Sequence, residues 1–184
     1  MRVEESKREP LEERSFYPFY RERLRRIVER LRKEYREMKI LQGSVWGQIG
    51  DALYGVFHMA AARTLIAELH ACKNGGLLSG NTAGEEFQSY GRLLEKQEYV
   101  DLILHGYPGL AGYLESLEEL QLAFWKEFLG RLQQDWGQIR KALQMDEEER
   151  VEFVERGSLD FHCGGKSVVM VCTDRGKRFF YKSH

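Results

Sequence analysis

Apolar residues recur at steps of three and four from about residue 16 to residue 145, which is the spacing of amphipathic helices. The first stripe comprises Phe16, Phe19, Tyr20, Leu24, Ile27, Val28, Leu31, Tyr35, Met38 and Leu41. Residues 42–47 interrupt the pattern, and a second stripe runs through about 48–72 from Ile49 to Leu69. The pattern therefore predicts a long helical region with a break near residue 45.

Turn and capping signals divide the rest of the helical region. The glycine-rich segment 73–82 predicts a loop, and Thr82 with Glu85 has the spacing of a capping box. We expect one helix behind it that fades near His105, followed by a break at Pro108, because proline disfavours helix in the preceding residue. Ser116 with Glu119 repeats the capping-box spacing and predicts the start of a long helix through Leu143.

The period of the pattern changes towards two after the acidic run 146–149. Strands are predicted at about 150–156, 167–173 and 178–182, with Asp174-Arg-Gly176 as a short hairpin connection. The expected fold class is α+β, mainly α: a helical region over 1–145, followed over 146–184 by a small antiparallel sheet like the start of a kinase small lobe.

Composition and charge exclude several classes of protein. Hydrophobic residues make up 42% and charged residues 31% of 184, which is a globular composition. The formal net charge of −1 argues against a nucleic-acid partner, and no apolar run is long enough for a membrane span. Three cysteines without CxxC spacing predict neither a disulfide framework nor a zinc site, so a reducing cytoplasm is expected.

One local charge imbalance stands out. Residues 1–39 hold 13 basic and 9 acidic side chains. Because the two signs alternate at helical spacings, we interpret this stretch as a solvated helix face rather than as a binding patch.

Residues that could take part in binding or catalysis are concentrated in the last 25 positions. A loop carrying Asp160 and His162 precedes the strand predicted at 167–173, and Lys182 ends the last strand. The loop continues through Gly164, Gly165 and Lys166. Glycines let backbone N–H groups approach an anion, and a lysine adds a compact positive charge, so the layout favours phosphate binding. The alternative is a tight turn beside an ordinary strand-end lysine. No metal site is predicted, because His162 and Cys163 lack a second pair of ligands.

The motifs resemble those of a known family. Asp160-x-His162-x-x-Gly165-Lys166-Ser167-Val168, followed by Asp-x-Gly and Tyr181-Lys182, resembles the Asp-x-His-Asn-x-Gly-Arg-Ser-Val…Val-Tyr-Lys-Pro-Arg segment of class II lanthipeptide synthetases. The segment lies in their N-terminal dehydratase domain. Arg63-Thr-Leu-Ile-Ala-Glu-Leu69, Leu78-Ser-Gly-Asn-Thr82, Tyr107-Pro108-x-Leu110 and Arg131-Leu-x-x-Asp135 also resemble stretches of that family, in the same order.

The resemblance implies a kinase-like enzyme that phosphorylates Ser and Thr of a ribosomal precursor peptide with ATP and Mg²⁺, then eliminates phosphate. It implies that Lys182 contacts the nucleotide phosphates. Gly164, Gly165 and Lys166 line the same cofactor site, with Gly165 permitting close backbone approach. Asp160 and His162 are the implied catalytic residues of phosphoryl transfer or elimination. Lys166 departs from the family's arginine, which keeps the charge but loses its bidentate fork.

The chain stops two residues after Lys182, so the family's downstream lobes and cyclase are not in it. We therefore expect residues 1–184 alone to be inactive and not to bind Mg²⁺-ATP tightly. The expected partners are the precursor peptide and those lobes, and an uncovered sheet edge predicts possible self-association. The alternative function is a noncatalytic helical module that docks a partner or precursor peptide.

Overall fold

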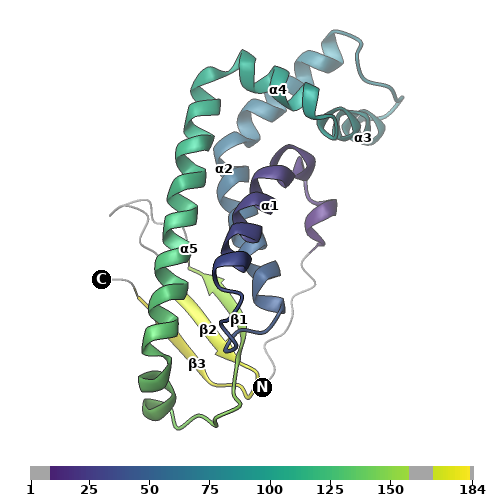
Figure 1. Cartoon of the computed structure of the whole chain (residues 1–184). Coiled ribbons are helices and arrows are strands. Elements are labelled where there is room, and N and C mark those ends of the chain that lie inside the picture. Colours follow the sequence, from purple (N-terminus) through teal and green to yellow (C-terminus); the bar gives the residue numbers. More distant parts are fainter. Residues whose placement is uncertain (1–8, 158–167, 183–184) are drawn as a thin grey trace. The chain divides into compact units, whose positions relative to one another are not determined.

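The computed structural model describes residues 9–157 and 168–182 (Figure 1). The helices in this part are η1 (Leu11–Glu13), α1 (Tyr17–Glu34), α2 (Ser44–Asn74), α3 (Ala83–Leu94), α4 (Gln97–Gly106) and α5 (Pro108–Ala142). The strands are β1 (Val151–Arg156), β2 (Val169–Thr173) and β3 (Arg178–Tyr181). The predicted fold class, α+β and mainly α, is confirmed, and so is the change from helix to strand after residue 146.

The described residues form two compact units. Unit 1 comprises 25–53, 119–157 and 168–182, and unit 2 comprises 9–24 and 54–118. The sheet thus shares unit 1 with helical residues from α1, α2 and α5. The predicted assignment of 146–184 to the small lobe of a larger enzyme stays a prediction.

The sheet of unit 1 is antiparallel, with strand order β1-β2-β3. Its register pairs Arg156 with Val169 and Val169 with Tyr181, so these residues form one row across the sheet. At the β2–β3 turn, Gly176 has a φ of 84°, a conformation that suits glycine because no Cβ is present. The three predicted strands and their hairpin are confirmed.

The start of α2 covers the outer edge of β1. In the α1–α2 connection, the amide of Gln42 donates to the carbonyl of Val151 at 2.8 Å. The amide of Val151 donates to the carbonyl of Ile40, also at 2.8 Å. Further along, the Gln48 side chain accepts from the Val154 amide at 2.8 Å and donates to the Glu152 carbonyl at 3.1 Å. These bonds satisfy backbone groups that an edge strand would otherwise expose.

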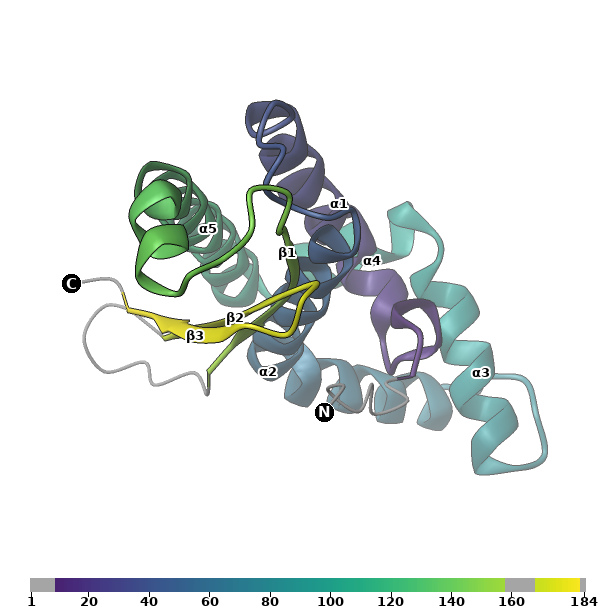
Figure 2. The same ribbon diagram turned by 90° about the horizontal axis from the view of Figure 1, so that it is seen from below.

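The C-terminal half of α5 lies beside the sheet (Figure 2). The Phe128 ring meets the Tyr181 ring of β3 edge-on, with centroids 5.8 Å apart. Buried side chains of unit 1 come from its helices and from β1 and β2: Ile27, Leu31, Val45, Ile49, Trp125, Leu129, Leu132, Val151, Val154, Val169 and Val171. The predicted apolar stripes thus supply this core.

Unit 2 has an aromatic core. Tyr20 is fully buried, and its ring lies edge-on to Tyr54, with centroids 5.8 Å apart. Phe16 meets Tyr90 in the same way at 6.0 Å, and the Tyr54 hydroxyl lies 3.3 Å from Nδ1 of His58. Burial lowers the pKa of His58 below its usual value, so this ring stays neutral at physiological pH.

The predicted capping box of α3 is confirmed. The Glu85 amide donates to the Thr82 hydroxyl at 3.3 Å, and the Glu85 carboxylate accepts from the Thr82 amide at 3.1 Å. The same carboxylate accepts from the Asn81 amide at 2.7 Å. These bonds to the charged form lower the pKa of Glu85, the Asn81 bond most.

The prediction of one helix from Thr82 to near His105 is wrong, because α3 ends at Leu94 and α4 begins at Gln97. With 100° of rotation per residue, one straight helix would place Ile103 about 180° around the axis from Leu94. Both side chains are buried. The break at residues 95 and 96 lets both face the core.

The predicted start of the last helix at Ser116 is also wrong. Helix α5 begins at Pro108, directly after the predicted break. The Ser116 hydroxyl donates to the Gly112 carbonyl at 3.0 Å, a bond back to the preceding turn. The spacing of Ser116 and Glu119 is that of a capping box, but this serine lies inside a helix. Helix α2 likewise begins at Ser44, a few residues before the predicted start near 48.

Candidate functional site

Lys182 lies at the same end of the sheet as Gly157 and Val168, the two described residues that flank 158–167. The loop leaves β1 after Arg156 and returns before Val169, the residue paired with Tyr181. The Gly157 amide donates to the Val168 carbonyl at 2.8 Å and closes the base of the loop. A Cβ on Gly157 would lie 3.2 Å from that carbonyl oxygen, so glycine fits the narrow base.

The other predicted site residues lie outside the described residues. These are Asp160, His162, Gly164, Gly165 and Lys166, all within 158–167. Their roles, and their closeness to Lys182, stay predictions. The described residues show that the chain leaves the sheet at the end of β1 and returns at the start of β2, the strand that pairs with β3.

Lys182 is exposed, and the residue before it is anchored to α5. The Tyr181 hydroxyl donates to the Asp135 carboxylate at 2.6 Å. Burial, followed by this hydrogen bond, raises the pKa of Tyr181 to about 12. Side chains alternate along a strand, and Phe180, between the half-buried Phe179 and Tyr181, is 69% exposed. Continuing the alternation, Lys182 follows Phe180 onto the face away from α5.

Arg156 adds a second positive charge at this end of the sheet, which sequence reasoning did not single out. Its guanidinium carbon lies 4.0 Å from the Phe124 ring centroid, and its side chain donates to the buried Gln121 amide oxygen. Desolvation lowers the pKa of Arg156 to about 10, so the group is still charged at neutral pH. Its place as the last strand residue before a glycine loop was the one available signal.

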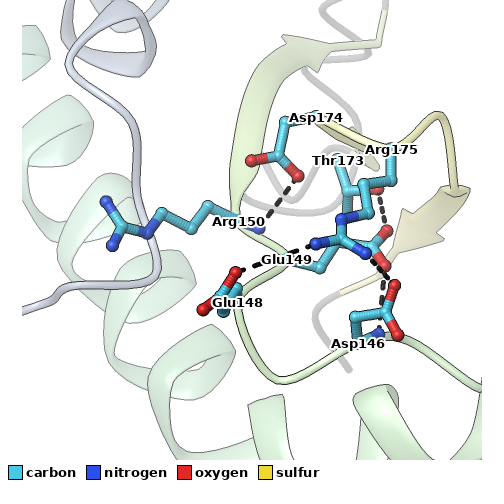
Figure 3. A network of polar contacts seen from close by, with 7 residues as sticks. All are labelled: Asp146, Glu148, Glu149, Arg150, Thr173, Asp174 and Arg175. Carbon is cyan, nitrogen blue, oxygen red and sulfur yellow. Dashed lines mark hydrogen bonds and ion pairs between the residues drawn. The ribbon is translucent and has the colours of Figure 1, made fainter.

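A polar network fixes the opposite end of the sheet (Figure 3). The buried Thr173 hydroxyl donates to the buried Glu149 carboxylate and accepts from the Lys177 amide at 3.0 Å. Asp174 accepts from the Arg150 amide at 3.1 Å, and Arg175 pairs with Asp146. These contacts tie the β2–β3 turn to the α5–β1 connection, so the register that leads to Lys182 is held from both ends.

Within 9–157 and 168–182, no three His, Cys, Asp or Glu side chains are grouped so that they could hold a metal ion. No helix in the same ranges combines the length and apolar character needed to cross a bilayer.

Comparison with known proteins gives one family match. A family model described as "Domain of unknown function (DUF4135)" matches residues 107–184, whereas no curated protein matches significantly. The matched segment contains α5, the three strands, and all of the predicted site residues. Over 107–184 the chain is therefore similar to a family whose description states no activity.

Proposed function

We propose that this chain is the N-terminal part of the dehydratase domain of a class II lanthipeptide synthetase. The complete enzyme would phosphorylate Ser and Thr of a precursor peptide with ATP and Mg²⁺, and then eliminate phosphate to give dehydroamino acids. The resemblance of the ordered motifs supports this proposal. The family match over 107–184 is compatible with it, because it includes the whole Asp160–Lys182 segment.

The observation that carries the proposal is the sheet register. It pairs Val169 with Tyr181, so the loop returns to the sheet beside the last residue of β3, which directly precedes Lys182. Glycine amides and a lysine at one end of a hairpin are suited to phosphate oxygens, because both approach closely and the lysine brings positive charge. Arg156 is charged at the same end of the sheet, but its guanidinium packs on Phe124 on the face towards α5.

The described residues fit one part of an ATP site. Lys182 is exposed and forms no ion pair with any described residue, so its ammonium group is available to the phosphates. Bound Mg²⁺-ATP would supply the phosphoryl group. The resemblance assigns Mg²⁺ ligation to segments of the complete enzyme that follow Lys182.

The test uses the complete synthetase with a Ser/Thr-rich precursor peptide. Mass spectrometry of the peptide would follow the gain of a phosphoryl group and the loss of water. We expect Lys182→Ala to abolish both changes, because phosphoryl transfer depends on neutralising charge on the γ-phosphoryl oxygens. Lys177→Ala is the matched control, because Lys177 is exposed on the same hairpin. Its backbone amide donates to the Thr173 hydroxyl and its carbonyl accepts from the Thr173 amide, and both hydrogen bonds are kept when the side chain is shortened. Full dehydration by the Lys182 variant would refute the assignment.

The proposal also covers residues 1–184 alone. We expect no peptide phosphorylation and no tight Mg²⁺-ATP binding in calorimetry, because a lysine and loop amides do not orient a hydroxyl for in-line transfer. Activity restored by adding the downstream lobes as a separate polypeptide would support the proposal. Micromolar nucleotide binding by the isolated chain would contradict it.

A second candidate function is a noncatalytic module that docks a partner or a precursor peptide. It is favoured by large apolar side chains exposed on unit 2, among them Met59 at 56%, Leu77 at 66% and Leu102 at 63%. Such side chains are candidates for partner contacts. The complementation experiment separates the two functions, because a docking module would bind the peptide but leave it unmodified even after the downstream lobes are added.

A further inference from the structure

Unit 1 contains a pocket of about 530 Å³ that the proposed function does not use. It lies at the connection between α1 and α2 and is completed by a residue more than 100 positions away in the sequence. Its lining includes four basic and two aromatic side chains: Arg32, Tyr35, Arg36, Lys39, Trp46 and Arg150. We refer to it as the Trp46 pocket.

Most of the positive charge of this pocket is not neutralised within the described structure. Arg36 pairs with Glu37, with Nε and Oε1 3.3 Å apart. Arg32, Lys39 and Arg150 are exposed, and none of their side chains forms an ion pair with a residue in 9–157 or 168–182. Three cations therefore remain available to an external anion.

Arg150 shows this most clearly, because it has acidic neighbours that it does not use. Its amide donates to Asp174, but its guanidinium points away from the carboxylates around it (Figure 3). Arg175 forms an ion pair with Asp146, and its Nη2 lies 3.9 Å from Oε2 of Glu148. The charge of Arg150 is thereby directed to the Trp46 pocket, which its side chain lines.

The aromatic part of the pocket is held in place. The Tyr35 hydroxyl donates to the Lys126 carbonyl at 2.8 Å, which fixes the ring. Trp46 lies in the first turn of α2, where it is half-buried, and its amide lies 3.4 Å from the Gly43 carbonyl oxygen. A half-buried indole beside cations offers an apolar surface next to positive charge.

We propose that the Trp46 pocket binds an acidic segment of polypeptide. Its carboxylates would pair with Arg32, Lys39 and Arg150, while an apolar side chain of the segment packs on Trp46. Small-molecule sites are mostly apolar and bury most of the ligand. Here the cations are exposed and come from three different segments of the chain, so an extended ligand with several separated charges fits better. This inference does not depend on the proposed function.

The test follows the fluorescence of the full chain on titration with a short glutamate-rich peptide that carries one leucine. Trp125 and Trp136 are buried, so a change in emission that Trp46→Phe removes reports on the pocket. Exposed ion pairs are weak, so we expect the double variant Arg32→Gln/Arg150→Gln to weaken binding by about tenfold. Binding should also weaken with added salt.

One control tests the position of the removed cation, and the other tests the charge of the peptide. Arg30→Gln removes an exposed cation from the same helix as Arg32 but outside the pocket lining, and it should leave affinity unchanged within about twofold. A peptide with glutamine in place of glutamate should not bind. Equal binding of the two peptides, or unchanged affinity of the double variant, would overturn the proposal. So would saturable binding of inorganic phosphate that displaces the glutamate peptide, since the pocket would then be a phosphate site.

Discussion

The phenol of Tyr181 donates a hydrogen bond of 2.6 Å to the carboxylate of Asp135, which joins the last strand to α5 across 46 positions of sequence. The residue after Tyr181 is Lys182, the best candidate for a phosphate contact. The bond therefore connects the stability of unit 1 with the position of the proposed site.

Tyr181→Phe removes this hydrogen bond and keeps the ring contact with Phe128. We expect a loss of about 1 to 2 kcal/mol in the free energy of unfolding, because the acceptor is a charged group. Urea denaturation would measure it. A double-mutant cycle with Asp135→Asn isolates the pair, and additive effects of the two changes would contradict a direct coupling.

The same tyrosine predicts a pH dependence. Its pKa in the folded protein is about 12, above the value of about 10 of a free phenol. The folded state therefore holds the proton more tightly, and this contribution to stability is complete below pH 10 and lost as the pH rises to about 12. Denaturation at rising alkaline pH should show a smaller decline for Tyr181→Phe than for the unmodified chain. Identical curves would show that Tyr181 is not responsible.

Thr173→Val tests the buried network at the hairpin turn. The change removes the donor to Glu149 and the acceptor of the Lys177 amide, and it leaves buried polar groups unsatisfied. We expect a loss of about 2 to 3 kcal/mol in the free energy of unfolding. Glu148→Gln is the control, because that side chain is 90% exposed, and it should change stability by less than about 0.5 kcal/mol. Equal effects would show that burial is not decisive here.

Gly80→Ala tests the loop that leads into α3. Gly80 has a φ of 136°, and an added Cβ would lie 2.5 Å from the Glu85 Cβ. We expect a loss of about 1 to 3 kcal/mol in stability, with faster amide hydrogen exchange at Thr82 and Glu85 as the capping box is disturbed. Gly84→Ala is the matched control, because its Cβ meets nothing within 4 Å inside a helix, and it should stabilise the protein by about 0.5 kcal/mol. A stabilising Gly80→Ala would contradict the structure.

The sequence by itself determined features that depend on neighbouring residues. Periodicity predicted the helices and the three strands, because an amphipathic helix or strand repeats its apolar positions at a fixed step. The Thr82 capping box was predictable for the same reason, since its two partners are three positions apart. At Ser116 the same spacing misled, because a short motif cannot show whether the chain before it is already helical.

Only the tertiary structure decided relationships between distant residues. In one straight helix, Leu94 and Ile103 would lie on opposite sides of the axis. The break between α3 and α4 follows only once the structure shows that both side chains are buried. The contacts of Gln48 with β1 and of Tyr181 with Asp135 span 106 and 46 positions, and no local pattern encodes them. Arg150 directly follows the acidic run 146–149, and only the structure shows that its side chain lines the Trp46 pocket. The neighbouring carboxylates have other partners: Arg175 pairs with Asp146 and lies 3.9 Å from Glu148, and Asp174 accepts from the Arg150 amide.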